Sequence, residues 1–193
     1  MKFYIETDRL ILRDILPEDA AGLYELDSDP EVHRYLGNDP VKSMDQVAGV
    51  IRFIRQQYID NGIGRWAIID KKSGAFIGWT GLKLITEPIN NHINYYDLGY
   101  RLIRRYWGQG IATESAIASL KYAFETLKTA EVFAMTDIEN KDSHNVLTKC
   151  GLKLLEQIEC YGGMHNWYCI TKEIFEQNQT MGKYGKSLEK KYE

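Results

Sequence analysis

The segment at residues 95–124 limits the possible folds of this chain more than any other. An apolar strand pattern, YYDLGYRLI at residues 95–103, leads into RRYWGQGIATE and then into a helical pattern at residues 113–124. Two glycines spaced G-x-G, Gly108 and Gly110, lie between the predicted strand and the predicted helix. A glycine-rich turn at the positive end of a helix leaves backbone N–H groups pointing outward, which is a general way to bind phosphate. A bare G-x-G fits a structural turn equally well, so the surrounding residues have to decide.

Two common phosphate-binding loops do not match this segment. The nucleotide P-loop requires G-x-x-x-x-G-K-S/T, and no Lys-Ser or Lys-Thr follows either glycine. The dinucleotide fingerprint G-x-G-x-x-G/A requires glycine or alanine where Thr113 stands, and it normally belongs to the first strand and turn of its domain. The sequence therefore argues against both classes of nucleotide site.

The segment resembles motif A of the GCN5-related N-acetyltransferase (GNAT) superfamily, Q/R-x-x-G-x-G/A, which RYWGQG at residues 105–110 matches. The longer string YWGQGIATE is similar to the branch that includes the RimJ/RimL-type ribosomal-protein N-acetyltransferases. Four further strings, LILRDILPEDA, FIGWTGL, NKDSHNVLTKCGL and WYCITKEIF, follow in that branch's order, so the resemblance covers roughly residues 6–175. It implies a GNAT fold and an enzyme, an acyltransferase that takes acetyl-CoA as acyl donor and a primary amine as acceptor.

Composition narrows the class further. The chain has 193 residues, 44% of them apolar and 26% charged, as expected of one soluble globular domain. A net charge of −3 provides no basic field for nucleic acid, so no nucleic-acid partner is expected. No apolar run approaches the roughly 20 residues of a membrane span, and the N-terminus lacks a secretory apolar region. These features predict a cytoplasmic protein without a membrane partner.

Cysteine and histidine usage gives no sign of a metal or redox site. The three cysteines, Cys150, Cys160 and Cys169, form no C-x-x-C, and buried reduced thiols are the expected state. The four histidines are scattered without ligand spacing. No metal cofactor is therefore expected.

The hydrophobic patterns and the resemblance together predict one α/β domain at residues 1–175 and a polar tail at residues 176–193. The sheet is expected to be single, mixed, mostly antiparallel and seven-stranded, with flanking helices. Its strands are expected at residues 6–14, 65–70, 76–85, 95–103, 131–136, 153–160 and 166–171. The helices are expected to begin at Pro17 and to span residues 43–61, 113–124 and 142–150. The resemblance implies that the fourth strand carries a bulge and splays away from the fifth.

The resemblance also implies a donor site at this splay and at the glycine turn. The N–H groups of roughly residues 105–113 are expected to hold the pyrophosphate, with positive charge from Arg104 and Arg105; a solvated surface position is the alternative for one of the two. Pantetheine is expected to insert like an extra strand, and the N–H of Leu102 is expected to act as oxyanion donor, a contribution of about 3–4 kcal/mol elsewhere. The residues expected to bind the donor are Leu102, Ile103, Arg104, Arg105, Gly108, Gln109, Gly110, Ile111, Ala112, Thr113, Asn140 and Ser143.

Asp97 is the candidate base that accepts the proton of the acceptor amine. It lies five residues before Leu102, where several GNAT proteins place a glutamate, and its shorter side chain favours a water relay. A structural or substrate-orienting carboxylate is the alternative. Glu87, His92 and Glu114 are weaker candidates, and Glu114 also fits a first-turn helix acid.

The leaving thiolate lacks the tyrosine that many GNAT proteins provide for it. That position, four residues before Gly151, is Leu147. The RimJ/RimL pattern N-x-x-S is matched by Asn140 and Ser143, and the resemblance implies that Asn140 contacts the donor and Ser143 gives a proton to the thiolate. Ser143 also fits a helix N-cap or a first-turn position.

Three functions stay open at this point. The resemblance favours acetyl transfer to a protein N-terminal α-amine, and a small amine such as a polyamine or an aminoglycoside is the alternative acceptor. A non-catalytic acyl-CoA-binding sensor is the third, supported only by Leu147. No motif positions a cysteine as a covalent relay, which favours direct transfer through a ternary complex. A homodimer is implied by the resemblance alone.

Overall fold

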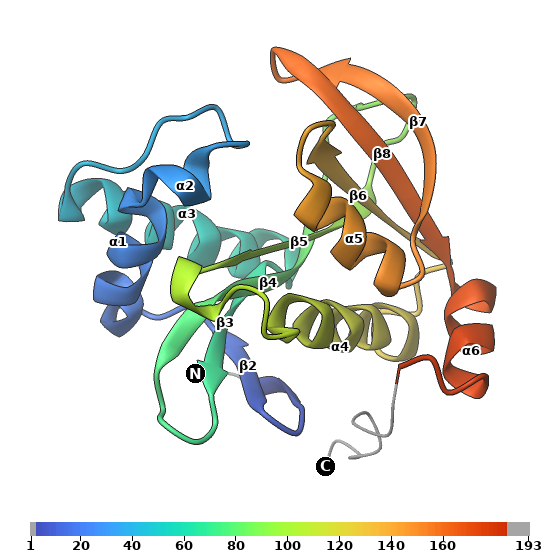
Figure 1. The fold of residues 1–193 in the computed structure, drawn as a ribbon, viewed down its shortest axis with the longest axis horizontal. Helices are drawn as coiled ribbons and strands as arrows, with labels where there is room; N and C mark the ends of the chain where they lie inside the picture. Colours follow the sequence, from blue (N-terminus) through green and yellow to red (C-terminus); the bar gives the residue numbers. More distant parts are fainter. Residues whose placement is uncertain (1–2, 185–193) are drawn as a thin grey trace.

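In the computed structural model, which describes residues 3–184, the chain forms one eight-stranded sheet with helices on both faces (Figure 1). The strand order is β1-β2-β3-β4-β5-β6-β8-β7. The strands are β1 Phe3–Glu6, β2 Leu10–Asp14, β3 Arg65–Asp70, β4 Phe76–Ile85, β5 Tyr95–Leu102, β6 Glu131–Asp137, β7 Lys153–Cys160 and β8 Gly163–Thr171. The helices are α1 Ala20–Ser28, α2 Pro30–His33, α3 Met44–Asn61, α4 Ile111–Glu125, α5 Lys141–Lys149 and α6 Lys172–Thr180, with 3₁₀ turns η1 Pro17–Asp19 and η2 Arg104–Tyr106. The predicted α/β class with a mixed sheet is confirmed.

The eighth strand arises because the single strand predicted at residues 6–14 is in fact a hairpin. β1 and β2 pair antiparallel around a tight turn, in which the N–H of Thr7 donates to the carbonyl of Leu10 at 2.9 Å. The N–H of Leu10 donates in turn to the hydroxyl of Thr7 at 3.0 Å. The turn residues Thr7, Asp8 and Arg9 include neither glycine nor proline, so the sequence carried no turn signal there.

The side chains of β3 explain why helices cover both faces of the sheet. Trp66 and Ile68 are fully buried in the cluster that includes α4, whereas Ala67 and Ile69 belong to the cluster formed with α1 and α3. Successive strand residues point to opposite faces, so four consecutive buried residues require a layer on each side. Figure 1 shows α1, α2 and α3 on one side and α4 and α5 on the other. Within residues 3–184, none of the helices combines the length and apolarity needed to cross a membrane.

The sheet opens between β5 and β6, as predicted. β5 and β6 run parallel and share the single register position Asp97↔Phe133, while β6 continues along β8 as far as Asp137. Figure 1 shows the two strands diverging beyond this point. The bulge expected in β5 is wrong, because its register with β4 runs unbroken from Ile85↔Tyr95 to Gly78↔Leu102. The opening therefore comes from divergence of β6 and not from an extra residue in β5.

Residues after the predicted domain end at 175 pack against the domain. α6 spans that boundary, and the Phe175 ring lies 5.1 Å from the Phe124 ring of α4. The buried Tyr184 donates its hydroxyl proton to the carbonyl of Cys150 at 2.9 Å. Residues 185–193 of the predicted tail lie outside the described residues, and where the domain ends stays a prediction.

Candidate active site

The glycine turn adopts a conformation that requires glycine. Gly108 and Gly110 have φ of 70° and 76°, in the left-handed region that strains side-chain-bearing residues. A Cβ at Gly108 would meet nothing within 4 Å, so the backbone angle and not crowding selects glycine there. Gly110 is the N-cap of α4, and the first intrahelical bond runs from the N–H of Glu114 to its carbonyl at 3.0 Å. The N–H groups of residues 111–113 therefore point out of the helix end.

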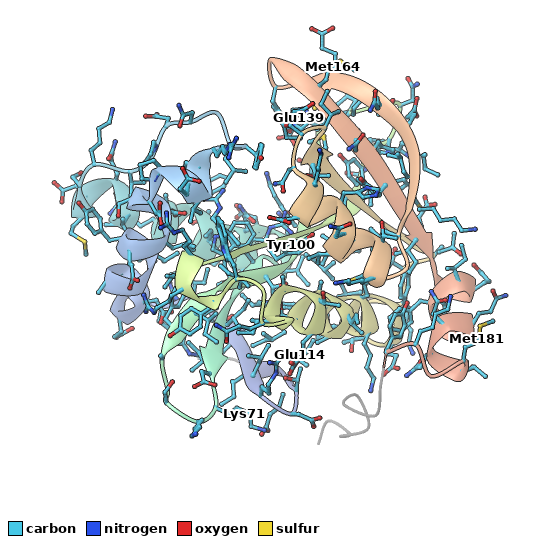
Figure 2. All side chains as sticks on the ribbon, in the orientation of Figure 1. Lys71, Tyr100, Glu114, Glu139, Met164 and Met181 are labelled. Carbon is cyan, nitrogen blue, oxygen red and sulfur yellow. The ribbon has the colours of Figure 1, made fainter. Side chains whose placement is uncertain are left out.

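The β1–β2 turn clamps this helix end from more than a hundred residues away. Arg9 Nε lies 2.6 Å from Glu114 Oε2, and Arg9 Nη1 donates to the carbonyl of Gln109 at 3.0 Å. The hydroxyl of Thr7 donates to Glu114 Oε1 at 2.6 Å, and Figure 2 shows Glu114 at this corner of the molecule. The carboxylate of Glu114 is thus compensated, so the positive end of α4 stays available to an anion. Sequence reasoning missed Arg9, because 105 positions separate it from Glu114 and no local signal joins them.

The two arginines before the glycine turn have different surroundings. Arg105 pairs with Glu25 of α1 and lies over the ring of Tyr106 at 4.8 Å, whereas Arg104 is exposed at the start of η2. The side chain of Trp107 is 43% exposed and is not part of the core. Its indole N–H instead donates to the carbonyl of Leu102 at 2.8 Å. Trp107 thus fixes the end of β5 relative to the turn.

The backbone of β5 presents polar groups to the splay. The N–H of Ile103 donates to the carbonyl of Ile77 at 2.9 Å, so Ile103 and Ile77 form a hydrogen-bonded pair between the end of β5 and β4. Bonded and non-bonded pairs alternate along an antiparallel ladder, which turns the N–H and carbonyl of Tyr100 and Leu102 away from β4. These groups face the side on which β6 has already diverged. The N–H of Leu102, expected as oxyanion donor, therefore points into the splay.

The side chain of Asp97 lies on the face of β5 opposite to the side chains of Tyr100 and Leu102, and an arginine holds it in place. Arg65 of β3 pairs with the carboxylate of Asp97 and also donates to its carbonyl at 2.6 Å. A Cβ at Gly99 would lie 2.7 Å from the Arg65 guanidinium, so glycine leaves room for the pair. Burial raises the pKa of Asp97 above its ordinary value, while Arg65 and then Lys83 oppose that rise. The structural role left open for Asp97 thus has a definite partner in Arg65.

Cations predominate on this face beside Asp97. The guanidinium groups of Arg65 and Arg101 lie 5.5 Å and 5.1 Å from the ring of Trp79. Arg101 is paired with Asp27 of α1 at 2.6 Å. Lys83 stands directly opposite Asp97 in the β4–β5 register. Three cations therefore accompany two carboxylates, each of which is already engaged by an arginine.

The start of α5 meets β5 across the splay. Asn140 Oδ1 accepts from the N–H of Ser143 at 3.0 Å, so Asn140 is the N-cap of α5, and Ser143 takes the first-turn position and not the N-cap position considered for it. The hydroxyl of Ser143 instead lies 2.9 Å from the hydroxyl of Tyr100, which Figure 2 shows between β5 and α5. Sequence reasoning missed Tyr100. Leu147 is buried in the core and offers no polar group.

The remaining candidates lie in other surroundings. His92 packs its ring on Phe133 and Trp167, at 4.5 Å and 5.8 Å, within an aromatic cluster on β6 and β8. Glu87 is exposed in the loop before β5. The side chain of Ile103 packs with α1 and α3, and its N–H is already bonded to β4. Asp97 is therefore the candidate base that lies on the strand beside the splay.

A helix end with outward-pointing N–H groups, a strand splayed from its parallel neighbour and a carboxylate on that strand are the main features of this site. The family model described as an acetyltransferase (GNAT) domain matches residues 9–153. The chain belongs to the GNAT acetyltransferase family. It is therefore an enzyme that transfers acetyl groups, and GNAT acetyltransferases use acetyl-CoA.

Relatives of this GNAT acetyltransferase are bacterial and fungal. The uncharacterized N-acetyltransferase YoaA of Bacillus subtilis (strain 168) is 29% identical over 149 residues, 77% of this chain and 82% of that protein. The FsC-acetyl coenzyme A-N(2)-transacetylase of Aspergillus fumigatus is 31% identical over 156 residues, 79% of this chain and 66% of that protein.

Solved structures share the GNAT fold, which confirms the predicted fold. A GNAT-family acetyltransferase from Bacillus anthracis has a TM-score of 0.74 at 22% identity, covering 89% of this chain and 99% of its own. RimL, a ribosomal L7/L12 alpha-N-protein acetyltransferase in complex with coenzyme A, has a TM-score of 0.74 at 18% identity, covering 88% of this chain and 98% of its own. The spermidine N-acetyltransferase from Vibrio cholerae, in complex with CoA and spermine, has a TM-score of 0.70 at 17% identity, covering 86% of this chain and 98% of its own. One fold therefore serves protein and polyamine acceptors, and the fold alone does not determine the acceptor.

Proposed function

We propose that this GNAT acetyltransferase moves the acetyl group of acetyl-CoA directly to the N-terminal α-amine of a peptide or protein. The charge of the face beside Asp97 carries this proposal. A polyamine is a chain of cations and needs unpaired carboxylates, whereas this face offers Arg65, Arg101 and Lys83 against two carboxylates already engaged. A peptide has one amine, and its carbonyl oxygens and acidic side chains suit such a face. The resemblance to the RimJ/RimL branch supports the same acceptor.

The residues present fit acetyl-CoA as the acyl donor. The N–H groups of residues 111–113 and the exposed Arg104 would hold the diphosphate, and the N–H of Leu102 would polarise the thioester carbonyl. Amide groups of a pantetheine arm have matching partners in the backbone of Tyr100, which is turned toward the splay. The residues proposed to line the donor are Leu102, Arg104, Arg105, Gly108, Gln109, Gly110, Ile111, Ala112, Thr113, Asn140 and Ser143; Ile103, which was also expected there, is left out because its N–H, its carbonyl and its side chain are engaged elsewhere.

The side chain of Arg9 is expected to support donor binding. Replacing it by alanine removes the cation that offsets Glu114 and the bond that holds the carbonyl of Gln109. We expect affinity for coenzyme A to fall about tenfold, the equivalent of roughly 1.4 kcal/mol, in calorimetric titration. Lys71→Ala is the matched control, because Lys71 binds Glu6 and the Thr7 carbonyl of the same hairpin but does not reach the glycine turn. Equal affinities of Arg9→Ala and Lys71→Ala would remove the clamp from the donor site.

Asp97 is proposed as the base for the acceptor amine, acting through water. Burial raises the pKa of Asp97 toward the neutral range, where a general base works best. The cations around it disfavour a protonated amine at the same place, which helps the amine lose its proton. Burial raises the pKa of the Cys150 and Cys169 thiols to about 12, so neither is a ready nucleophile. Direct transfer to the amine follows from this set of groups.

Lys83 is expected to select acceptors by charge. In the variant Lys83→Glu, a carboxylate replaces the cation opposite Asp97. The kcat/KM for acidic peptides should therefore fall, and the kcat/KM for basic amines should rise. We expect the ratio of kcat/KM for an acidic N-terminal peptide over that for spermidine to fall at least about tenfold. Release of free thiol from acetyl-CoA measures both rates.

The control for this prediction is Lys72→Glu, which makes the same change of charge at the exposed β3–β4 turn. It should leave the ratio unchanged. Preference of the wild-type protein for spermidine over all peptides would contradict the proposed acceptor. Absence of thiol release with every amine, despite binding of acetyl-CoA, would favour the non-catalytic sensor.

A further inference from the structure

We propose that Tyr100 is a positioning residue for acetyl transfer, which orients the hydroxyl of Ser143 toward the sulfur of the acyl donor. A thiolate that leaves in a partly buried site needs a hydrogen-bond donor, and the buried Leu147 provides none. The inference rests on the proposed donor site at the splay, but it is independent of which amine accepts the acetyl group.

The hydroxyl of Ser143 is not used to cap α5. Asn140 already caps α5. The phenol oxygen of Tyr100 lies 2.9 Å from Ser143 Oγ and 3.1 Å from the carbonyl oxygen of Ser143. One phenol thus contacts two polar atoms of a single residue, 43 positions away in the sequence. Ser143 also lies in the first turn of a nine-residue helix, where partial positive charge favours an anion.

The register of β5 places this pair at the splay. The side chains of Leu98, Tyr100 and Leu102 point to the face covered by α4, and the backbone of Tyr100 and Leu102 faces the gap left by β6. The Tyr100 phenol therefore bridges from β5 to α5 across the line where the two strands separate. A thioester polarised by the N–H of Leu102 would enter the same gap that this phenol crosses.

The two hydroxyl groups can redirect a proton without moving heavy atoms. When Tyr100 donates to the carbonyl of Ser143, the serine hydroxyl donates to the phenol oxygen. When Tyr100 donates to Ser143 Oγ, the serine proton is free to point at the sulfur. Burial raises the pKa of Tyr100, although its bond to Ser143 opposes this, so the phenol stays neutral and acts as a donor and not as an acid.

The transfer step balances with this assignment. The amine nitrogen forms the new bond to the acetyl carbon, the carbon–sulfur bond breaks, and its electron pair goes to sulfur. The nitrogen loses one proton to water beside Asp97, and sulfur gains one proton from solvent. Ser143 contributes a hydrogen bond to the sulfur while negative charge is on it and keeps its own proton, so its role here is that of a hydrogen-bond donor and not of the proton source that the resemblance implies.

The test follows the thiol of bound coenzyme A and needs no acceptor. Thiolate absorbance of the complex is titrated against pH, with the complex of desulfo-coenzyme A as blank to remove the signal of tyrosines. In the wild-type protein the thiol pKa of bound coenzyme A is expected to lie about one pH unit below that of free coenzyme A. Tyr100→Phe and Ser143→Ala should each return it to the free value, and the double variant should add nothing further. Tyr96→Phe, which removes a hydroxyl from the same face of β5, should keep the lowered value.

Turnover supplies a second readout. Tyr100→Phe is expected to lower kcat about tenfold with the KM for acetyl-CoA unchanged, because the bond is needed only as charge leaves on sulfur. The inference is overturned if the thiol pKa of coenzyme A bound to Tyr100→Phe equals that in the wild-type complex. If that variant fails to fold, an unchanged thiol pKa in Ser143→Ala overturns it equally. A lowered thiol pKa that depends on Tyr100, in a protein that acetylates no peptide, would leave the inference standing and refute the proposed acceptor alone.

Discussion

Replacing Gly110 by aspartate is expected to weaken binding of coenzyme A about a hundredfold. The new carboxylate would stand at the N-cap of α4, in front of the N–H groups of residues 111–113 that are proposed to hold the diphosphate. Two unit charges about 5 Å apart repel by about 3 kcal/mol at an effective dielectric constant near 20, which is roughly a hundredfold in affinity. Calorimetric titration with coenzyme A measures the effect directly.

The control for this prediction is another glycine with nearly the same backbone angle. Gly74, in the turn between β3 and β4, has φ of 71°, against 76° for Gly110. Gly74→Asp therefore introduces a similar strain and the same charge, but far from the glycine turn in the sequence. Equal loss of affinity in the two variants would mean that strain or net charge is responsible, and the proposed diphosphate site would be wrong.

The variant Asp97→Asn is expected to lower kcat/KM by about two to three orders of magnitude, the usual effect of losing a general base. Asparagine keeps an oxygen for Arg65, so the fold and the affinity for coenzyme A should change little. The pH dependence gives the sharper test. A base works only when ionised, so wild-type activity should rise as pH increases through the pKa of Asp97, which burial holds above its ordinary value of 3.8. In Asp97→Asn this acid limb should disappear.

A second carboxylate on the same face separates catalysis from charge pairing. Asp27 is paired with Arg101 as Asp97 is with Arg65, but it lies on α1 and not on the splayed strand. Asp27→Asn is expected to reduce thermal stability and to keep the acid limb. Persistence of the limb in Asp97→Asn would assign the base to another group and leave Asp97 as the partner of Arg65.

Local signals explain what could be predicted from the sequence. The G-x-G between a strand pattern and a helix pattern predicted the turn, and the structure adds that both glycines have positive φ, which glycine adopts without strain. The prediction of a single first strand was wrong because its turn contains no glycine or proline to mark it. The turn at Thr7, Asp8 and Arg9 is formed by a side-chain hydrogen bond that alternation does not reveal.

The contacts of the site were not predictable in this way. Arg9 meets Glu114 across 105 positions and Tyr100 meets Ser143 across 43, and neither pair has a sequence signal of its own. Each depends on which face of a strand a residue occupies, and a shift of one residue in register would reverse that face. The position of Ser143 beside β5 further depends on how far β6 diverges after Asp97.

The sequence by itself therefore determined the family, the order of the main elements from Pro17 to Thr171 and the place of the glycine turn before α4, because periodicity and turn chemistry act over a few residues. Only the tertiary structure decided that Ser143 turns to Tyr100 and that Asp97 lies among cations. These are contacts between distant segments. They are set by strand register and by the opening of the sheet, which no local pattern encodes.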